Sequence, residues 1–255
     1  MFKKLKQHRF LFEELVKRDF KKKYTRTVLG IGWSVLSPLL YLLVMSIVFT
    51  QFFGRNSPHY TIYLFCGILM YNFFGDSTRE GMSSLMSNAH IFSKVNVPKY
   101  LFLLAKNVQT LVNFAIILVV FFGFCIFDGI TFSWKMLLLI YPISCMVLLN
   151  VGVGMILSAL FMFFRDVQYL WSVFLQLLMY MSAIFYKVES YAPAIRKFFH
   201  INPVFNAIYY FRQIVIDSTI PSVGLHLLML GYALAAFGVG CWMYKKYNHQ
   251  FLYYV

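Results

Sequence analysis

The chain is poor in acidic residues, with nine Asp and Glu against 23 Lys and Arg in 255 residues, and its formal net charge is +14. Charge of either sign is absent from six long stretches: 27–54, 56–75, 107–127, 136–164, 167–186 and 218–244. Each has at least the roughly 20 residues that a helix needs to cross about 30 Å of hydrocarbon. With 60% hydrophobic residues, these stretches argue against a water-soluble domain and predict an all-α membrane protein with six transmembrane helices.

Several chemical signatures are also missing. The sequence has no GxxxxGK[ST] phosphate-binding loop, so the chain cannot hold a nucleotide in that manner. The six stretches contain no acid that could relay protons at the centre of a membrane. If this protein moves a molecule uphill, we therefore expect the energy to come from a partner.

Metal and catalytic motifs are absent as well. The four cysteines lie inside or at the ends of apolar stretches without CxxC spacing, and the six histidines are scattered singly. The sequence therefore predicts no metal site and no catalytic residue in this chain. Nucleic acid is not an expected partner, because the aromatic residues lie in the apolar stretches and not among the basic residues.

The distribution of Lys and Arg predicts the orientation. Segment 1–26 carries ten of them, and seventeen in total fall on its side of the predicted membrane, against six on the other side. Short cytoplasmic loops concentrate Lys and Arg, so both termini are expected inside. Segment 1–26 lacks the apolar core and cleavage site of a signal peptide.

Segment 1–26 predicts an amphipathic interfacial helix, followed by one six-helix domain over 27–255. Drawn as a helix, it places apolar residues on one face and charged residues on the other. The apolar face consists of Phe2, Leu5, Phe12, Leu15, Val16 and Phe20, and the charged face of Lys6, Glu14, Lys17, Arg18 and Lys21. A solvated basic tail is the alternative interpretation.

Two connections carry polar or unusual residues. Asp76, Arg79 and Glu80 have helical spacing after the second stretch, which favours a structural ion network over a substrate contact. Between residues 87 and 98 we expect a short helix parallel to the membrane, ended by Pro98. Segment 187–217 is too apolar for an ordinary outer loop and too short to cross, so it predicts a re-entrant helical hairpin or an outer interfacial helix.

Aromatic residues make up 20% of the chain. Interface belts and lipid-facing packing explain most of them. Two stripes have helical spacing, Trp33, Ser37 and Tyr41 in the first stretch and Trp171, Phe174 and Leu178 in the fifth. A second hypothesis is that these stripes line a passage for a sugar polymer, because the C–H faces of sugars stack on aromatic rings.

Three segments together resemble the ABC-2 type permease family, specifically its exporters of O-antigen, capsular polysaccharide and teichoic acid. The first is similar to an RYxx(S/T)xLGxxW pattern with a following Pro, matched by Tyr24, Leu29, Gly30, Trp33 and Pro38 with Lys23 in place of Arg. The second is similar to NAxLIxKVxFPR, matched by Asn88, Ala89, Lys94, Val95 and Pro98. The third is matched by Arg165, Asp166, Ser182, Tyr186, Asn202, Pro203 and Arg212, with Ala183 where Pro is common.

The resemblance implies a half-transporter that works as a homodimer in the bacterial cytoplasmic membrane, above two copies of an ATPase subunit that bind ATP and Mg. This chain itself would hold no cofactor. Segment 87–99 would be the coupling helix that docks on the ATPase, with contacts from His90, Phe92, Lys94 and Pro98. Arg165 and Asp166 would form a second contact or a structural cap. An outer gate would use segment 187–217 together with Tyr186, Asn202, Pro203 and Arg212.

The expected substrate is an undecaprenyl-pyrophosphate-type lipid-linked glycan. Several cations near the inner surface would meet its pyrophosphate: Arg18, Lys21, Lys22, Lys23 and Arg26. General attraction to anionic membrane lipid explains the same charges.

Three rival functions remain open at this point. One is an ABC-2 permease for a small drug or lipid. Another is a polytopic membrane glycosyl- or acyltransferase, for which Asp76, Glu80 and Glu189 are the candidate acids. A non-transporting scaffold is the third.

Overall fold

The computed structural model describes residues 8–25, 28–49, 58–95, 97–188, 191–248 and 250–252. In these residues the secondary structure is helical and contains no strand, which confirms the all-α class. The helices are α2 (Arg9–Tyr24), α3 (Trp33–Phe49), α4 (Tyr60–Ser83), α5 (Ala89–Phe92), α6 (Tyr100–Phe127), α7 (Ile140–Phe163), α8 (Val167–Met181), α9 (Pro193–Phe199), α10 (Pro203–Val215) and α11 (Val223–Tyr247).

Three segments of the described chain are long and apolar enough to cross a membrane. They are Tyr100–Phe127, Trp134–Phe163 and Val223–Tyr247, whereas Trp33–Met45 and Val167–Met181 are shorter apolar helices. α4 is also long, with 24 residues, but its last turns are polar. The structure thus confirms several apolar helices, while six spans with both termini inside remain a prediction.

α8 ends earlier than the fifth uncharged stretch suggested. The helix stops at Met181, and Ala183 adopts a left-handed backbone with φ 48°. The hydroxyl of Ser182 turns back to donate to the Leu178 carbonyl oxygen at 2.7 Å. Charge-free sequence continues to Tyr186, so only the backbone reveals this end.

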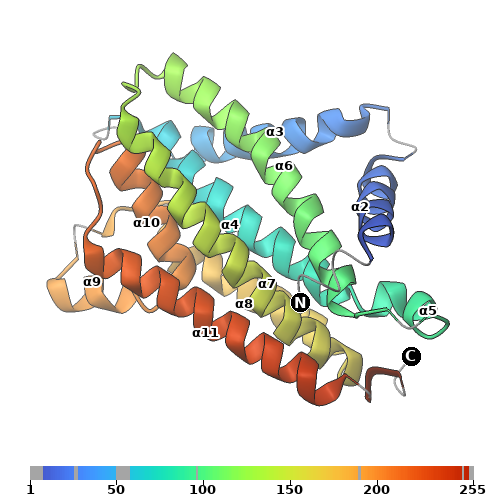
Figure 1. Ribbon diagram of the computed structural model, residues 1–255. Helices are drawn as coiled ribbons and strands as arrows, with labels where there is room; N and C mark the ends of the chain where they lie inside the picture. Colours follow the sequence, from blue (N-terminus) through green and yellow to red (C-terminus); the bar gives the residue numbers. More distant parts are fainter. Residues whose placement is uncertain are drawn as a thin grey trace.

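α4 is the central helix of the fold (Figure 1). It packs against α3, α6, α7, α8 and α10, and most of its residues are buried. Its first four turns are apolar on every face, as expected of a helix that is enclosed by other helices. Phe65 of α4, for example, meets Phe121 of α6 edge to face at a ring distance of 5.2 Å.

Glycines allow α7 to approach its neighbours closely. A Cβ at Gly152 would lie 2.4 Å from the backbone nitrogen of Phe237 on α11, and a Cβ at Gly240 would lie 2.8 Å from the Gly152 carbonyl oxygen. On another side of α7, a Cβ at Gly81 of α4 would lie 3.1 Å from the Cα of Gly154. Small residues of this kind allow close helix packing without specifying a partner, and the structure places the partners of Gly152 and Gly154 within the same chain.

The N-terminal helix packs on the bundle. α2 contacts α6, and Leu15 is buried, while Leu11, Phe12 and Val16 are half-buried. Glu14, Lys17 and Lys21 on its other side are exposed. Phe2, Leu5 and Lys6 lie outside the described residues. The helix therefore exists with an apolar side, and its position on a membrane surface remains a prediction.

Figure 1 also shows which elements share an end of the bundle. α2, α5 and the turn Gln250–Leu252 after α11 gather at one end, and α9 lies at the opposite end. The predicted coupling segment and the predicted outer hairpin are thus on opposite sides of the molecule.

Candidate functional site

The predicted coupling segment is built from two short helical turns. A 3-10 turn over Met86–Asn88 leads into α5, which ends at Phe92, well before Pro98. His90 and Lys94 are exposed, whereas Phe92 is only 4% exposed. Pro98 is half-buried and lies two residues before Tyr100, the first residue of α6. His90 and Lys94 are therefore the predicted contact residues whose side chains face outward.

Phe92 holds this segment against the bundle. Its ring lies 6.1 Å from the ring of Phe102 on α6, in a second apolar cluster that also contains Leu15, Leu85 and Phe251. The Nζ of Lys99 lies 5.6 Å from the centre of the same ring. Phe92 thus fixes the position of α5 and, in this conformation, does not present its side chain to a partner.

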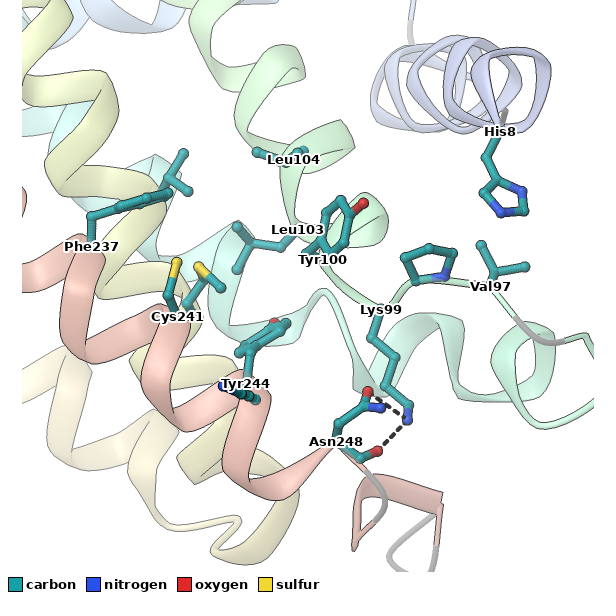
Figure 2. A pocket seen from close by; sticks show the side chains of 14 residues that line it. His8, Val97, Lys99, Tyr100, Leu103, Leu104, Phe237, Cys241, Tyr244 and Asn248 are labelled. Atoms are coloured by element: carbon teal, nitrogen blue, oxygen red, sulfur yellow. Dashed lines mark hydrogen bonds between the residues drawn. The ribbon is translucent and has the colours of Figure 1, made fainter. Parts of the chain in front are cut away.

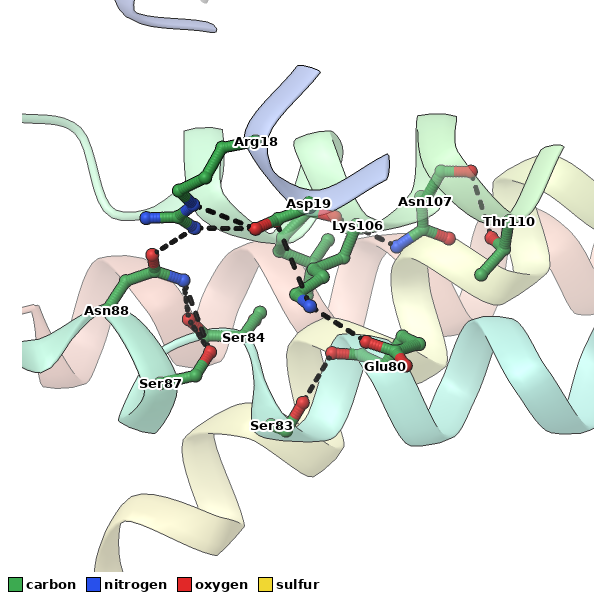
Figure 3. A network of polar contacts seen from close by, with 11 residues as sticks. Arg18, Asp19, Glu80, Ser83, Ser84, Ser87, Asn88, Lys106, Asn107 and Thr110 are labelled. Atoms are coloured by element: carbon green, nitrogen blue, oxygen red, sulfur yellow. Dashed lines mark hydrogen bonds and ion pairs between the residues drawn. The ribbon is translucent and has the colours of Figure 1, made fainter. Parts of the chain in front are cut away.

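A network of polar contacts joins the coupling segment to α2 (Figure 3). Arg18 donates to the Oδ1 of Asn88 and to the Oδ1 of Asp19, both at 2.7 Å. Asn88 in turn donates to the carbonyl oxygen of Ser84 at 2.8 Å. The side chain of Asp19 is 4% exposed and lies 3.8 Å from the Nζ of Lys106 on α6. Lys106 also pairs with Glu80 of α4 at 2.9 Å.

This network was only partly visible in the sequence. Arg79 does pair with Asp76, at 3.3 Å and on the surface, but Glu80 pairs with Lys106 instead. The available signal was Asp19, which falls on the same helical face as Leu15 and Val16. An acid on the apolar face of a helix indicates a buried ion pair, because an unpaired buried carboxylate would be strongly unfavourable.

Of the five cations predicted to meet a pyrophosphate, the structure describes two side chains. Arg18 is half-exposed and engaged with Asp19 and Asn88, and Lys21 is exposed. The side chains of Lys22 and Lys23, and the whole of Arg26, lie outside the described residues.

Arg165 and Asp166 form a tight turn between α7 and α8, and both are exposed. The carbonyl oxygen of Asp166 accepts from the backbone N–H groups of Tyr169 and Leu170, which starts α8. The guanidinium of Arg165 lies 5.9 Å from the ring centre of Phe161. Val167, directly after the turn, and Met86 both pack against the cluster of Met82, Leu157 and Phe161, so the turn and the start of the coupling segment share one apolar cluster.

The two aromatic stripes lie on helices that flank α4. On α3, Trp33 and Ser37 are exposed and Tyr41 is half-buried, with its hydroxyl 3.7 Å from the Sδ of Met179 on α8. On α8, the indole N–H of Trp171 donates to the Thr78 hydroxyl of α4 at 3.1 Å, and its ring stacks on Phe174 at 4.9 Å. The structure therefore brings the stripes onto neighbouring helices, where Trp33, Ser37 and Phe174 face outward.

Arg212 organises the opposite end of the molecule. It is 6% exposed, and its guanidinium donates to the carbonyl oxygens of Tyr63, Ala183 and Ile184 at 2.9–3.3 Å. The guanidinium also lies 3.4 Å above the centre of the Tyr63 ring. Arg212 of α10 thus joins the start of α4 to the turn after α8.

The other predicted gate residues surround this turn. Asn202 caps α10 by accepting from the N–H groups of Val204 and Phe205, and its amide donates to the Ser182 hydroxyl at 2.9 Å. Pro203 occupies the first position of α10, where a missing N–H does no harm. The hydroxyl of Tyr186 donates to the Tyr180 carbonyl oxygen at 2.8 Å, and its own carbonyl oxygen accepts from Tyr63 at 2.6 Å.

A cavity of about 440 Å³ adjoins these residues. Its lining is mostly aromatic and apolar and includes Phe174, Tyr180, Tyr186, Phe198 and Phe199, with Asn202 and Pro203 at its edge. Phe174 belongs to this cavity and to the α8 stripe, so the stripe and the predicted gate are continuous.

The long apolar helices are those of a multi-pass membrane protein. The chain belongs to the ABC-2 type transporter family, because the sequence model of that family matches residues 11–216. This match extends from α2 through the end of α10.

Individual relatives are similar over most of their length. The O-antigen export system permease protein RfbA of Klebsiella pneumoniae is 26% identical over 245 residues, covering 94% of both chains. RfbA of Myxococcus xanthus is 27% identical over 192 residues, covering 74% of this chain and 73% of its own. The polysialic acid transport protein KpsM of Escherichia coli is 22% identical over 248 residues, covering 94% of both.

These similarities favour transport over catalysis. The family is a transporter family, which is consistent with a transport subunit and gives no support to the enzyme alternative. Of the acids considered for catalysis, Asp76 and Glu80 are held in ion pairs with Arg79 and Lys106. Glu189 lies outside the described residues.

Proposed function

We propose that this protein is the permease subunit of an ATP-driven exporter that moves a lipid-linked polysaccharide across the bacterial cytoplasmic membrane. The observation that carries the proposal is the similarity, over 94% of both chains, to proteins named for O-antigen export and polysialic acid transport. The aromatic-lined cavity and its continuity with the α8 stripe support a sugar polymer as the substrate.

In the proposed topology α3, α4, α6, α7, α8 and α11 are the six spans, with both termini inside. The excess of Lys and Arg at 1–26 supports this orientation, as does the gathering of α2, α5 and the turn Gln250–Leu252 at one end (Figure 1). α9 and α10 then form the outer hairpin. α3 and α8, at 17 and 15 residues, cross where the bilayer is thin or shielded by neighbouring helices.

The transport pathway lies, in this proposal, between two copies of the chain. α8 exposes Leu170, Val173, Phe174 and Leu177, and α3 exposes Leu40, Leu43, Val44 and Ile47. The glycines of α7 already pack against α4 and α11 of the same chain, so we do not expect them at the interface between the two copies. A second copy that meets α3 and α8 would enclose the two aromatic stripes and leave α6, α7 and α11 facing lipid.

The motor is a separate ATPase that binds ATP and Mg. His90 and Lys94 reach outward from α5 and the turn after it, and Val167, next to the Arg165–Asp166 turn, packs against the same apolar cluster as Met86. A displacement of this segment is transmitted to α4 and α6, because the segment connects them. Arg212, Asn202 and Tyr186 then form the outer gate with Pro203, since the hydrogen bonds of the first three join α4 and α10 to the end of α8 and the turn after it, and Pro203 begins α10.

The inner-leaflet substrate is expected to be an undecaprenyl-pyrophosphate-type lipid-linked glycan. Lys21 and the neighbouring Lys22, Lys23 and Arg26 provide positive charge where its two phosphates would arrive. The negative surface potential of an anionic leaflet attracts each of these cations by about 1 kcal/mol, which would keep them near the headgroups. Arg18 adds charge from within the network at α2. Charge reversal at Lys22 and Arg26 tests this role, and unchanged export would reject it.

Co-purification and crosslinking test the whole proposal. A Lys94→Cys variant in a Cys241→Ala background is expected to crosslink to a co-purified ATPase subunit. A Lys135→Cys control near the opposite end should not, because the Lys135 ammonium is bonded to the carbonyl oxygen of Ser218 there. Cells without the gene should accumulate lipid-linked glycan inside. Normal surface glycan with retention of a small drug or lipid would instead support the small-substrate permease.

A further inference from the structure

A cavity of about 870 Å³ lies where α6 begins and α11 ends. Figure 2 shows side chains of the two helices facing each other across it, with Leu103 and Leu104 on α6 and Phe237 and Cys241 on α11. Val151 and Met155 of α7 also line it. No residue of α3 or α8 contributes to the lining, so this cavity is separate from the proposed transport pathway.

The lining changes from charged to apolar with depth. On α11, Lys245, Cys241 and Phe237 line the cavity at intervals of four residues, which is about one helical turn. Lys245 therefore lies at the end of the helix, with Cys241 one turn deeper and Phe237 two turns deeper. On α6 the same order holds, because Lys99 precedes the helix and Leu103 lies one turn inside it. The cavity thus has a cationic mouth and an apolar interior.

Lys99 is a buried cation without a carboxylate partner among the described residues. Its ammonium donates to the backbone oxygen of Asn248 and to the side-chain oxygen of Asn248 at 3.3 Å. The rings of Phe92 and Phe251 lie 5.6 and 5.8 Å away. An ammonium has three N–H donors, so the two Asn248 oxygens leave one donor and the full charge available. Burial lowers the pKa of Lys99, because removal from water disfavours its charged form.

We propose that this cavity binds an anionic glycerophospholipid, with its phosphate at Lys99 and Lys245 and an acyl chain along Leu103, Leu104 and Phe237. The cationic mouth and the apolar interior together favour this ligand. A phosphate accepts hydrogen bonds from ammonium groups, and a hydrocarbon chain fills an apolar cavity. The surrounding bilayer supplies such molecules in the leaflet at this end of the bundle. Under the proposed orientation this is the inner leaflet. The inference does not depend on which molecule is exported.

Cys241 offers a direct readout, because it lines the cavity and is partly exposed, whereas Cys66, Cys125 and Cys145 are buried. The rate of Cys241 alkylation by a maleimide is measured on the purified full-length protein in detergent. Phosphatidylglycerol is expected to slow alkylation several-fold more than phosphatidylcholine with identical acyl chains. Cys241→Ala gives the background rate.

Matched lysine variants test the headgroup contact. Lys99→Gln and Lys245→Gln should each remove the preference for phosphatidylglycerol. Lys246→Gln should retain it, because Lys246 lies over the rings of Trp242 and Tyr247 and does not line the cavity. Lys245 is exposed, so its variant keeps the test valid if Lys99→Gln fails to fold.

Four results would overturn the proposal. Equal protection by both lipids would mean that any hydrocarbon fills the cavity, and no protection by either would mean that no lipid binds. Protection by a polyprenyl pyrophosphate but not by phosphatidylglycerol would assign the cavity to the exported substrate. A large increase in the lipid-free alkylation rate on deletion of residues 2–7 would show that the chain's own N-terminus occupies it.

Discussion

The carboxylate of Asp19 on α2 lies 3.8 Å from the ammonium of Lys106 on α6, and both side chains are largely buried. Arg18 and Glu80 extend this pair at the surface, at 2.7 Å from Asp19 and 2.9 Å from Lys106. The pair fixes the N-terminal helix against the membrane domain, because its two charges come from helices distant in sequence.

We expect Asp19→Asn to lower the free energy of unfolding by about 1.5–3 kcal/mol, the range for hydrogen bonds to charged groups. The change leaves Lys106 with a single acidic partner. Asp76→Asn is the matched control, because Asp76 pairs with Arg79 in solvent and exposed pairs contribute about 0–1 kcal/mol. Thermal unfolding of the detergent-solubilised protein measures both. Equal losses in the two variants would contradict a special role for Asp19.

The coupling segment should separate into outward and structural residues. His90→Ala and Lys94→Glu are expected to reduce export severalfold while the protein remains as stable as before, because both side chains are exposed. Phe92→Ala should lower stability by about 3–5 kcal/mol, the range for a truncated buried Phe. Export assays together with protein levels in membranes distinguish the two effects. Normal export in Lys94→Glu would remove it from the ATPase contact.

Because α7 and α11 approach each other closely at Gly152, we expect the fold not to tolerate a methyl group added there. Gly152→Ala would place its Cβ 2.4 Å from the Phe237 nitrogen, so one helix must shift, and we expect a loss of about 1–3 kcal/mol or more. Gly123→Ala on α6 is the control, since, apart from its own stretch of helix, none of the described residues has an atom within 4 Å of its Cβ position. Folded yield on size-exclusion chromatography measures the difference, and equal yields would be inconsistent with this packing.

Arg212 should be irreplaceable by smaller polar residues. Arg212→Gln removes a guanidinium whose donors serve the carbonyl oxygens of Tyr63, Ala183 and Ile184, so buried acceptors lose their partners. We expect a lower unfolding temperature and weaker protection of the α8–α9 turn in hydrogen exchange. Arg196→Gln provides the comparison, because Arg196 is exposed on α9. Unchanged exchange in Arg212→Gln would contradict its role as an organiser of this end.

The α8 stripe yields a prediction about transport alone. Phe174→Ala should slow export without a change in stability, because Phe174 is 45% exposed and lines the aromatic cavity. Val239→Ala on α11 is the matched control, because Val239 is 49% exposed, does not line the cavity and lies on a helix that the proposed dimer leaves facing lipid, so export should be retained. Rates of surface glycan appearance check this pair. Equal rates in the two variants would exclude the cavity from the pathway.

The sequence predicts the helices better than their contacts. Charge-free stretches located α6, α7 and α11, because burial in lipid requires long apolar helices. The same stretches could not show that α8 ends at Met181, since Ala183 departs from helical geometry while remaining apolar. Nor could they reveal that Gly152 faces Phe237, because that proximity depends on how two distant helices pack.

For the candidate site, too, the sequence identified residues but not their contacts. Motif positions such as Arg212 and Asn202 were found, yet their hydrogen-bond partners are mostly backbone groups, which cannot be identified from residue types. Phe92 was expected at a partner surface and is buried. Asp19 was overlooked because it stands among cations that suggested a solvated surface.

The hydrogen bond from Arg18 to Asn88 has a mechanical consequence. In the proposed arrangement, with an ATPase docked at α5 and α2 among the lipid headgroups, a push on α5 would also drag α2 sideways through those headgroups. The resistance of that leaflet to lateral displacement then becomes part of the load on the motor, and stiffer membranes would slow each turnover even with saturating ATP.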